Sequence, residues 1–343
     1  MINIAFLMQS WYAGGTEVGM YNITNYLKSN YPNEFNFHFI ATQNKKIQKH
    51  FNKIGTALYM GEKWPNTTNY LKSNNIHILQ WGNISQYARC AFDANVPVII
   101  ERISGPRSLG KNHTYNTHII SSSDGIVTKI KNEWNGPITV IKNGIATKNI
   151  QPNRFNFNKN DFIVVYPAAR SGIGQNHQML IKATIKAHAT NPKIKLILMG
   201  KHASHAAEPS IEPKLKKLAE PLGNSCIFTG FVSDPDPIIS GSNLCCVPAK
   251  SHGISNALIT AAAYGLPLIS TDVGQNNEIC QHNKNGFLVR LNDIGGLSQC
   301  ILKLSNKPNL CKKMGQESKN VAQNNFNIQK QGEKYYQLYK SFF

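Results

Sequence analysis

The segment from residue 248 to residue 279 constrains the fold more strongly than any other part of this sequence. It opens with small polar residues, and Ser255 or Asn256 can cap the apolar helix that follows. Gly265 ends this helix, Pro267 prevents its continuation, and the apolar run after them predicts a short buried strand. Because a helix N-terminus presents unpaired N–H groups and a positive dipole end, the loop before it suits a phosphate group or sugar hydroxyls.

Short apolar runs alternate with helix-forming segments along the whole chain. The predicted strands lie at residues 2–8, 37–41, 76–81, 96–100, 121–128, 138–145, 162–166, 194–200, 226–232, 243–247 and 266–270. Such alternation predicts an α/β protein whose parallel sheets carry helices on both faces. A length of 343 residues favours two domains.

Residues that follow two of the predicted strands are further candidates for ligand contacts. Gly14 and Gly15 follow the first strand and precede an amphipathic run, where a backbone without Cβ atoms can approach a phosphate closely. Arg102 follows the strand at 96–100, and ligands of open parallel sheets bind beyond the carboxyl ends of strands. Arg102 is therefore a candidate contact for an anionic group, with an ordinary ion pair as the alternative.

The segment at 248–279 resembles the donor-binding motif of the family 4 glycosyltransferases, which are retaining enzymes of the GT-B fold. The matching positions are Pro248, Gly253, Asn256, Ala261, Gly265, Pro267, Thr271 and Gly274, and the match continues through Glu278 and Ile279. The Gly-Gly-x-Glu pattern at residues 14–17 resembles the opening of the same enzymes. The resemblance covers nearly the whole chain and is better in the second half.

This resemblance implies two Rossmann-like doubly wound domains that face each other across a cleft. An acceptor-side domain is expected at residues 1–150 and a nucleotide-sugar-binding domain at 151–320, joined by a linker at about 144–160. A C-terminal helix at 321–343 is expected to cross back to the first domain. The co-substrate implied is a UDP- or GDP-linked sugar, and the resemblance implies no cofactor and no metal.

The sequence departs from the family at four positions. His252 and Thr260 replace two glutamates that usually hold the sugar and the ribose of the sugar donor, and Gln175 replaces a lysine beside the diphosphate. No histidine follows the strand at 96–100, whereas many family members have one there. A histidine can donate to a sugar hydroxyl and a threonine can bind a ribose hydroxyl, so the predicted site keeps polar contacts.

The predicted catalytic residues are Arg170, which matches the family arginine that neutralises the diphosphate, together with His252 and Arg102. The resemblance assigns the sugar donor to a larger set of positions. These are Gly14, Gly15, Arg170, Gln175, Gly200, Phe231, Val232, His252, Gly253, Ile254, Ser255, Asn256 and Thr260. The reaction expected is sugar transfer with retention, in which the protein mainly stabilises the departing diphosphate.

The charge balance bears on the acceptor. Lys and Arg number 37 against 18 Asp and Glu, which gives a net charge of +19. A polyanionic neighbour, either an anionic membrane surface or nucleic acid, fits this excess. We expect a membrane-associated glycolipid or cell-surface glycan precursor as acceptor. The alternatives are a modified base in DNA, flipped into the cleft, and a non-catalytic module that binds sugars or nucleotides.

The remaining sequence features concern the cellular compartment. Seven cysteines without paired spacing predict reduced thiols rather than a zinc site or disulfides. No apolar run approaches the roughly 20 residues of a spanning helix, and the chain opens with a strand-like segment. These features predict a cytoplasmic protein, with peripheral association at the inner membrane face as the expectation from its charge.

Overall fold

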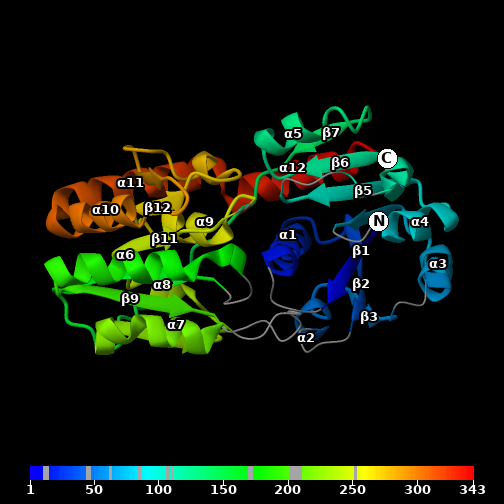
Figure 1. The fold of residues 1–343 in the computed structure, drawn as a ribbon. Helices are drawn as coiled ribbons and strands as arrows, with labels where there is room; N and C mark the ends of the chain where they lie inside the picture. The colour runs from blue at the N-terminus through cyan, green and yellow to red at the C-terminus, as the bar shows by residue number, and fades with distance from the viewer. Residues whose placement is uncertain are drawn as a thin grey trace. The chain divides into compact units, whose positions relative to one another are not determined.

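The computed structural model describes residues 1–343 except 11–14, 44–47, 62–63, 83–85, 106–108, 110, 169–172, 201–210 and 251–252. It consists of two compact units (Figure 1). Unit 1 comprises Met1–Gly144 and Phe326–Phe343, and unit 2 comprises Ile145–Asn325. Each unit has its own parallel sheet, which confirms the predicted α/β class with two doubly wound domains.

Unit 1 contains a seven-stranded sheet in the order β3-β2-β1-β4-β5-β6-β7. Its strands are β1 Ile2–Ser10, β2 Phe35–Gln43, β3 Thr56–Tyr59, β4 Ile78–Trp81, β5 Val98–Ile103, β6 His118–Ser121 and β7 Ile138–Val140. Every pairing is parallel. The strand order reverses between β1 and β4, which is the doubly wound arrangement.

Helices cover both faces of this sheet, because successive residues of a strand point to opposite sides. Phe6 of β1 belongs to the core under α1 and α12, whereas its neighbour Leu7 belongs to the core under α3 and α4. The helical elements of unit 1 are α1 Gly15–Asn30, α2 Gln48–Phe51, α3 Trp64–Ser73, α4 Gln86–Asp93, η1 Lys111–Tyr115, α5 Asp124–Ile130 and α12 Ile328–Lys340.

One strand prediction was wrong. Residues 121–128 were expected to form a strand, but β6 ends at Ser121 and α5 occupies Asp124–Ile130. The β-branched residues of this segment favour a strand. They are overridden by Ser123, whose hydroxyl accepts a hydrogen bond from the backbone N–H of Ile126 at 3.2 Å and caps the helix.

The C-terminal helix α12 belongs to unit 1. Tyr335 and Tyr339 are fully buried in its core, and the Tyr339 hydroxyl donates to the side-chain oxygen of Gln80 at 2.7 Å. The backbone N–H of Gly144 donates to the side-chain oxygen of Gln331 at 2.8 Å. Tyr335 and Tyr339 thus belong to the core of unit 1, whereas the last residue, Phe343, is 57% exposed.

Unit 2 contains a six-stranded parallel sheet in the order β10-β9-β8-β11-β12-β13. Its strands are β8 Phe162–Pro167, β9 Ile194–Met199, β10 Cys226–Gly230, β11 Leu244–Val247, β12 Leu268–Thr271 and β13 Gly286–Val289. Its helical elements are η2 Ile173–Gln175, α6 His177–Thr190, α7 Glu212–Ala219, η3 Glu220–Ser225, α8 Asp236–Ser240, α9 Asn256–Ala263, η4 Asn276–Glu278, α10 Ile294–Asn306 and α11 Pro308–Asn325.

The division between the units differs from the expected boundaries at 150 and 320. A linker was expected at about 144–160, but residues 145–160 belong to unit 2. There Arg154 donates hydrogen bonds to the backbone oxygens of Gly241 and Asp161, each at 2.7 Å. The helix α11 continues to Asn325, so residues 321–325 belong to unit 2 and not to the C-terminal helix.

All seven cysteines are free thiols in the structure. Burial raises the pKa of Cys226 and of Cys280 to about 12, so these thiols stay protonated near neutral pH. Among the described helices, none is at once long and apolar enough to cross a membrane.

Candidate functional site

The carboxyl ends of the unit 2 strands carry most of the residues predicted to bind the sugar donor. Gln175 follows β8, Gly200 follows β9, Phe231 and Val232 follow β10, and the segment 253–256 follows β11. Because all five strand pairings of this sheet are parallel, these strand ends share one edge. Ligands of open parallel sheets bind at such an edge.

The loop after β8 is fixed by a buried tyrosine. The Tyr166 hydroxyl lies 2.6 Å from the side-chain oxygen and 3.0 Å from the backbone oxygen of Gln175. Tyr166 is fully buried and its ring packs against His177, with the ring centroids 4.7 Å apart. Burial raises the pKa of Tyr166 well above its usual value, so its hydroxyl remains a hydrogen-bond donor.

This contact decides what Gln175 can offer to a ligand. Its carboxamide oxygen accepts from Tyr166, which leaves the N–H groups of the same amide as hydrogen-bond donors. The backbone N–H of Lys250 donates to the oxygen of Gly174 at 2.8 Å and ties the loop to the end of β11. Gln175 is therefore a neutral donor, held in place, where the resembled family has a cation.

The helix α9 begins where the sequence predicted. Asn256 is its first residue, and Ser255 is the N-cap with extended backbone angles of φ −75° and ψ 114°. The Ser255 side chain makes no capping hydrogen bond, so it does not satisfy the N–H groups of the first helical turn. These groups and the positive end of the helix suit an anionic or hydroxylated ligand.

Thr260 lies in α9 four residues after Asn256. Residues four apart share a face of a helix, so both side chains belong to the same face. Thr260 is half-buried, whereas Ile254 and Ser255 before the helix are buried. The hydroxyl of Thr260 is one helical turn from the helix N-terminus and can hydrogen-bond a ligand hydroxyl.

The ends of β9 and β10 are joined by two glycines. Gly200 and Gly230 form an antiparallel bridge, and their φ angles of 88° and 70° favour glycine at both positions. Phe231 follows directly and is 59% exposed, while Val232 is half-buried. An exposed ring beside a sheet edge provides a flat apolar surface for a planar ligand group.

Thr271, a residue of the matched motif, supports this edge of the sheet without being exposed at it. Thr271 at the end of β12 is fully buried, and its hydroxyl donates to the backbone oxygen of Ala249 at 2.5 Å. This bond holds the chain between β11 and α9, which includes Gly253. The sequence identified Thr271 as a motif position, but its role depends on strand pairing that only the structure provides.

Three predicted residues fall outside the described part of the chain. These are Gly14, Arg170 and His252. Gly15 is described as the first residue of α1 in unit 1. Among the described residues, no group of three or more His, Cys, Asp or Glu side chains is arranged to hold a metal ion.

The structure gives Arg102 hydrogen-bond partners that the sequence did not reveal. One guanidinium nitrogen donates to the Tyr335 hydroxyl at 2.8 Å and another donates to the side-chain oxygen of Asn143 at 2.5 Å, all within unit 1. The guanidinium carbon also lies 5.9 Å from the centre of the Tyr335 ring. Arg102 thus joins β5 to α12 within unit 1, and its catalytic role stays a prediction.

Comparisons with known proteins agree with this geometry. Residues 163–307 match the family model described as glycosyl transferases group 1. The Bacillus subtilis protein EpsD is 32% identical over 168 residues, which cover 48% of this chain and 42% of that protein. UDP-Gal:alpha-D-GlcNAc-diphosphoundecaprenol alpha-1,3-galactosyltransferase from Escherichia coli is 28% identical over 118 residues, 34% of this chain and 30% of that enzyme.

The chain therefore spans less than half the length of these curated relatives. Over the whole chain the structure resembles the crystal structure of Anabaena HepE in complex with UDP and glucose. The TM-score is 0.82 at 16% identity, and the superposition covers 99% of this chain and 100% of HepE. This likeness establishes the GT-B fold.

Proposed function

Since residues 163–307 form a domain of the group 1 glycosyltransferase family on a GT-B fold, we propose that this protein transfers a sugar from a nucleotide-sugar donor to an acceptor. The observation that carries the proposal is the shared carboxyl edge of the unit 2 sheet. There Gln175 follows β8, Phe231 follows β10 and the N-terminus of α9 follows β11, all inside the matched segment.

The proposed chemistry is largely electrostatic. Breaking the bond between the sugar and the diphosphate leaves positive charge on the sugar and negative charge on the leaving group. The N-terminus of α9 and the amide of Gln175 supply fixed donors for that negative charge, and Arg170 is assigned to it from its sequence position. We propose retention at the anomeric carbon and a reaction that uses neither a metal nor another cofactor.

The two missing glutamates change how the sugar donor is held. We assign the ribose hydroxyls to Thr260, whose side chain shares a face of α9 with Asn256. We assign a hydroxyl of the transferred sugar to His252, which precedes the loop glycine Gly253 in sequence. Phe231 supplies an exposed ring against which the base can pack.

The proposed donor is a UDP-linked hexose, with the GDP-linked form as the second choice. HepE has been crystallised with UDP and glucose, and the name of the Escherichia coli relative specifies UDP-Gal. The same name specifies an acceptor linked to diphosphoundecaprenol, which is a lipid carrier. We therefore propose a membrane-associated glycolipid or glycan precursor as acceptor.

The charge of the chain supports this acceptor. A net charge of +19 attracts an anionic membrane surface, where such an acceptor resides. We propose that the protein works in the cytoplasm and binds peripherally at the inner membrane face. Binding to vesicles that contain anionic lipid would then weaken steeply as the salt concentration rises.

The test is binding and transfer with a panel of UDP- and GDP-sugars. Thermal stabilisation by one nucleotide sugar is expected, followed by transfer of that sugar to a lipid-linked acceptor in a mass-spectrometric assay. Arg170→Ala is expected to lower kcat on the order of 10²-fold, as the loss of other transition-state charge contacts does. Arg290→Ala, which removes an exposed arginine of the same unit, is the matched control and should change little.

Two results would contradict the proposal. Stabilisation by no member of the panel would mean that the site does not bind a sugar donor. Tight binding without transfer to any acceptor, and without hydrolysis of the sugar donor, would instead favour a binding module on the same fold.

A further inference from the structure

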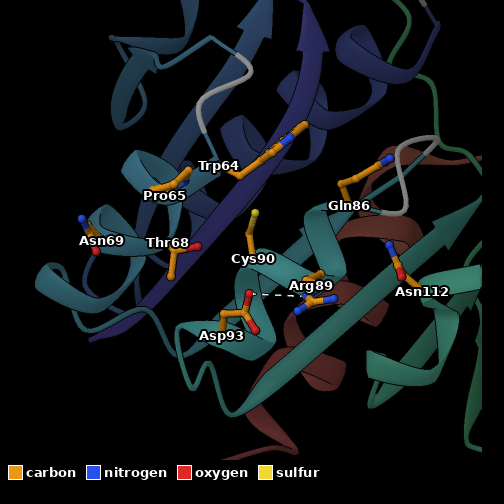
Figure 2. Close-up of a pocket in the computed structure, with 9 residues that line it drawn as sticks. All are labelled: Trp64, Pro65, Thr68, Asn69, Gln86, Arg89, Cys90, Asp93 and Asn112. Atoms are coloured by element: carbon orange, nitrogen blue, oxygen red, sulfur yellow. Dashed lines mark ion pairs between the residues drawn. The ribbon is translucent and has the colours of Figure 1, made fainter.

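Unit 1 contains a pocket of about 430 Å³ between α3 and α4 (Figure 2). None of its lining residues is among those assigned to the sugar donor. The two helices provide its walls, and η1 adds Asn112. Its volume falls in the range of ordinary small-molecule sites.

An indole ring forms one side of the pocket. Trp64 is half-buried, and its ring meets that of Tyr87 edge-on, with centroids 5.6 Å apart and an interplanar angle of 67°. Tyr87 is itself fully buried, and its hydroxyl donates to the backbone oxygen of Met8 at 3.0 Å. Because its neighbour is anchored in the core, the plane of the indole is fixed before any ligand binds.

Three carboxamides also line this pocket. Asn69 projects from α3, Gln86 from α4 and Asn112 from η1, and Figure 2 shows them around the pocket. None of the three makes a side-chain hydrogen bond to another residue that the structure describes. Each amide can donate and accept at the same time.

The charges at the pocket cancel. Arg89 and Asp93 on α4 form an ion pair with 3.6 Å between the arginine Nε and a carboxylate oxygen, drawn as a dashed line in Figure 2. Both side chains are exposed and keep further donors and acceptors for a ligand. In a chain with a net charge of +19, this balanced lining argues against a phosphate or another anion as the ligand.

We propose that this pocket binds a neutral sugar residue of a glycan. A pyranose has an apolar face of C–H groups, whose slight positive charge suits the negative face of an indole. Its hydroxyls both donate and accept, and so do the amides and the ion pair around Trp64. The site goes beyond the proposed transfer reaction, because it recognises sugar in unit 1 without a nucleotide.

The experiment uses the full chain and no nucleotide. Methyl glycosides of glucose, galactose and N-acetylglucosamine, together with cellobiose and chitobiose, are tested by saturation-transfer NMR and titrated by tryptophan fluorescence. At least one sugar is expected to bind, and Trp64→Ala and Asn69→Ala should each weaken its binding about tenfold, the size of one lost stacking or hydrogen-bond contact. Asn66→Ala is the matched control, since Asn66 is an exposed asparagine of the same helix outside the pocket.

The outcomes separate this site from the proposed function. The inference is overturned if no sugar binds, if Trp64→Ala and Asn69→Ala bind as tightly as the native chain, or if inorganic phosphate competes with the sugar. If Trp64→Ala does not fold, Asn69→Ala still tests the inference, because Asn69 is exposed and its replacement should not disturb folding. Nucleotide-sugar stabilisation of the same samples reports on the donor site alone and should be equal in all folded variants.

Discussion

The Tyr166 hydroxyl donates a hydrogen bond to the side-chain oxygen of Gln175 across 2.6 Å. Tyr166 is the penultimate residue of β8, and Gln175 closes the turn that precedes α6. The bond fixes the orientation of the one carboxamide that stands where the resembled family has a lysine. A buried phenol thus sets the direction in which a neutral donor is presented.

Removal of this hydroxyl should loosen Gln175. Tyr166→Phe leaves the carboxamide without its partner, which we expect to lower the free energy of unfolding by about 1 kcal/mol. The affinity for the sugar donor should fall several-fold as the amide becomes free to rotate, with kcat changed less than KM. Calorimetric titration with UDP measures this effect. Tyr70→Phe, which removes a tyrosine hydroxyl bonded to His38 in unit 1, is the control and should leave UDP affinity unchanged.

Restoration of the family lysine should tighten diphosphate binding. Gln175→Lys adds a positive charge at the carboxyl edge of the sheet, where a charge-assisted contact is roughly twice as strong as a neutral one. We expect UDP affinity to rise by about tenfold at low salt and this gain to shrink as salt is added. Titrations at two salt concentrations test the prediction, and Lys250→Gln tests whether an existing lysine already supplies the charge. An unchanged affinity in Gln175→Lys would remove this position from the diphosphate site.

Two parts of the structure followed from sequence for identifiable reasons. Strands buried on both faces are continuous apolar runs, so most of the parallel strands were visible without coordinates. The end of α9 was visible in the sequence because glycine is common just after a helix. In the structure Gly265 has a φ of 77°, which is strained for a residue with a Cβ. The strand predicted at residues 121–128 was wrong, because the prediction gave the β-branched residues more weight than the helix-capping residue Ser123.

The partners of Arg102 were not visible in the sequence for a different reason. The rule for open sheets gives the position of a residue at a strand end but not the partner of its side chain. That partner is Tyr335, which lies 233 residues away in sequence. The Tyr166–Gln175 bond was hidden in the same way, since the pattern of residues does not reveal that the turn folds back over the strand.

Arg102 should therefore matter for stability more than for catalysis. Arg102→Met removes two hydrogen bonds from a charged donor, to Tyr335 and Asn143, and a hydrogen bond to a charged group contributes about 1.5–3 kcal/mol. The free energy of unfolding should fall by that amount, while kcat of the folded enzyme should change less than about threefold. Denaturant titration and activity on the same sample test both statements. The control is Arg89→Met, which breaks the exposed ion pair with Asp93 and should barely change stability. A large loss of kcat in Arg102→Met at unchanged stability would instead support a catalytic role for Arg102.

Acid should destabilise unit 1 through two buried histidines. His38 and His118 are 5% and 6% exposed, and burial lowers the pKa of each imidazole from its usual value of 6.5. His38 is bonded to the Tyr70 hydroxyl and His118 to the Thr139 hydroxyl, each across 2.8 Å. The folded state therefore keeps both rings neutral to a lower pH than the unfolded chain does, which binds protons below about pH 6.5.

The sign follows from this difference in bound protons. Stability is complete above the unfolded pKa and falls as the pH drops below about 6.5, by up to about 1.4 kcal/mol per pH unit for each histidine that is protonated only when unfolded. Urea titrations at pH 7.5, 6.5 and 5.5 measure the slope, and His38→Gln with His118→Gln should flatten it. His50→Gln is the control, since His50 is exposed, and should keep the slope of the native chain. A slope in the double variant as steep as in the native protein would show that other groups control the acid response.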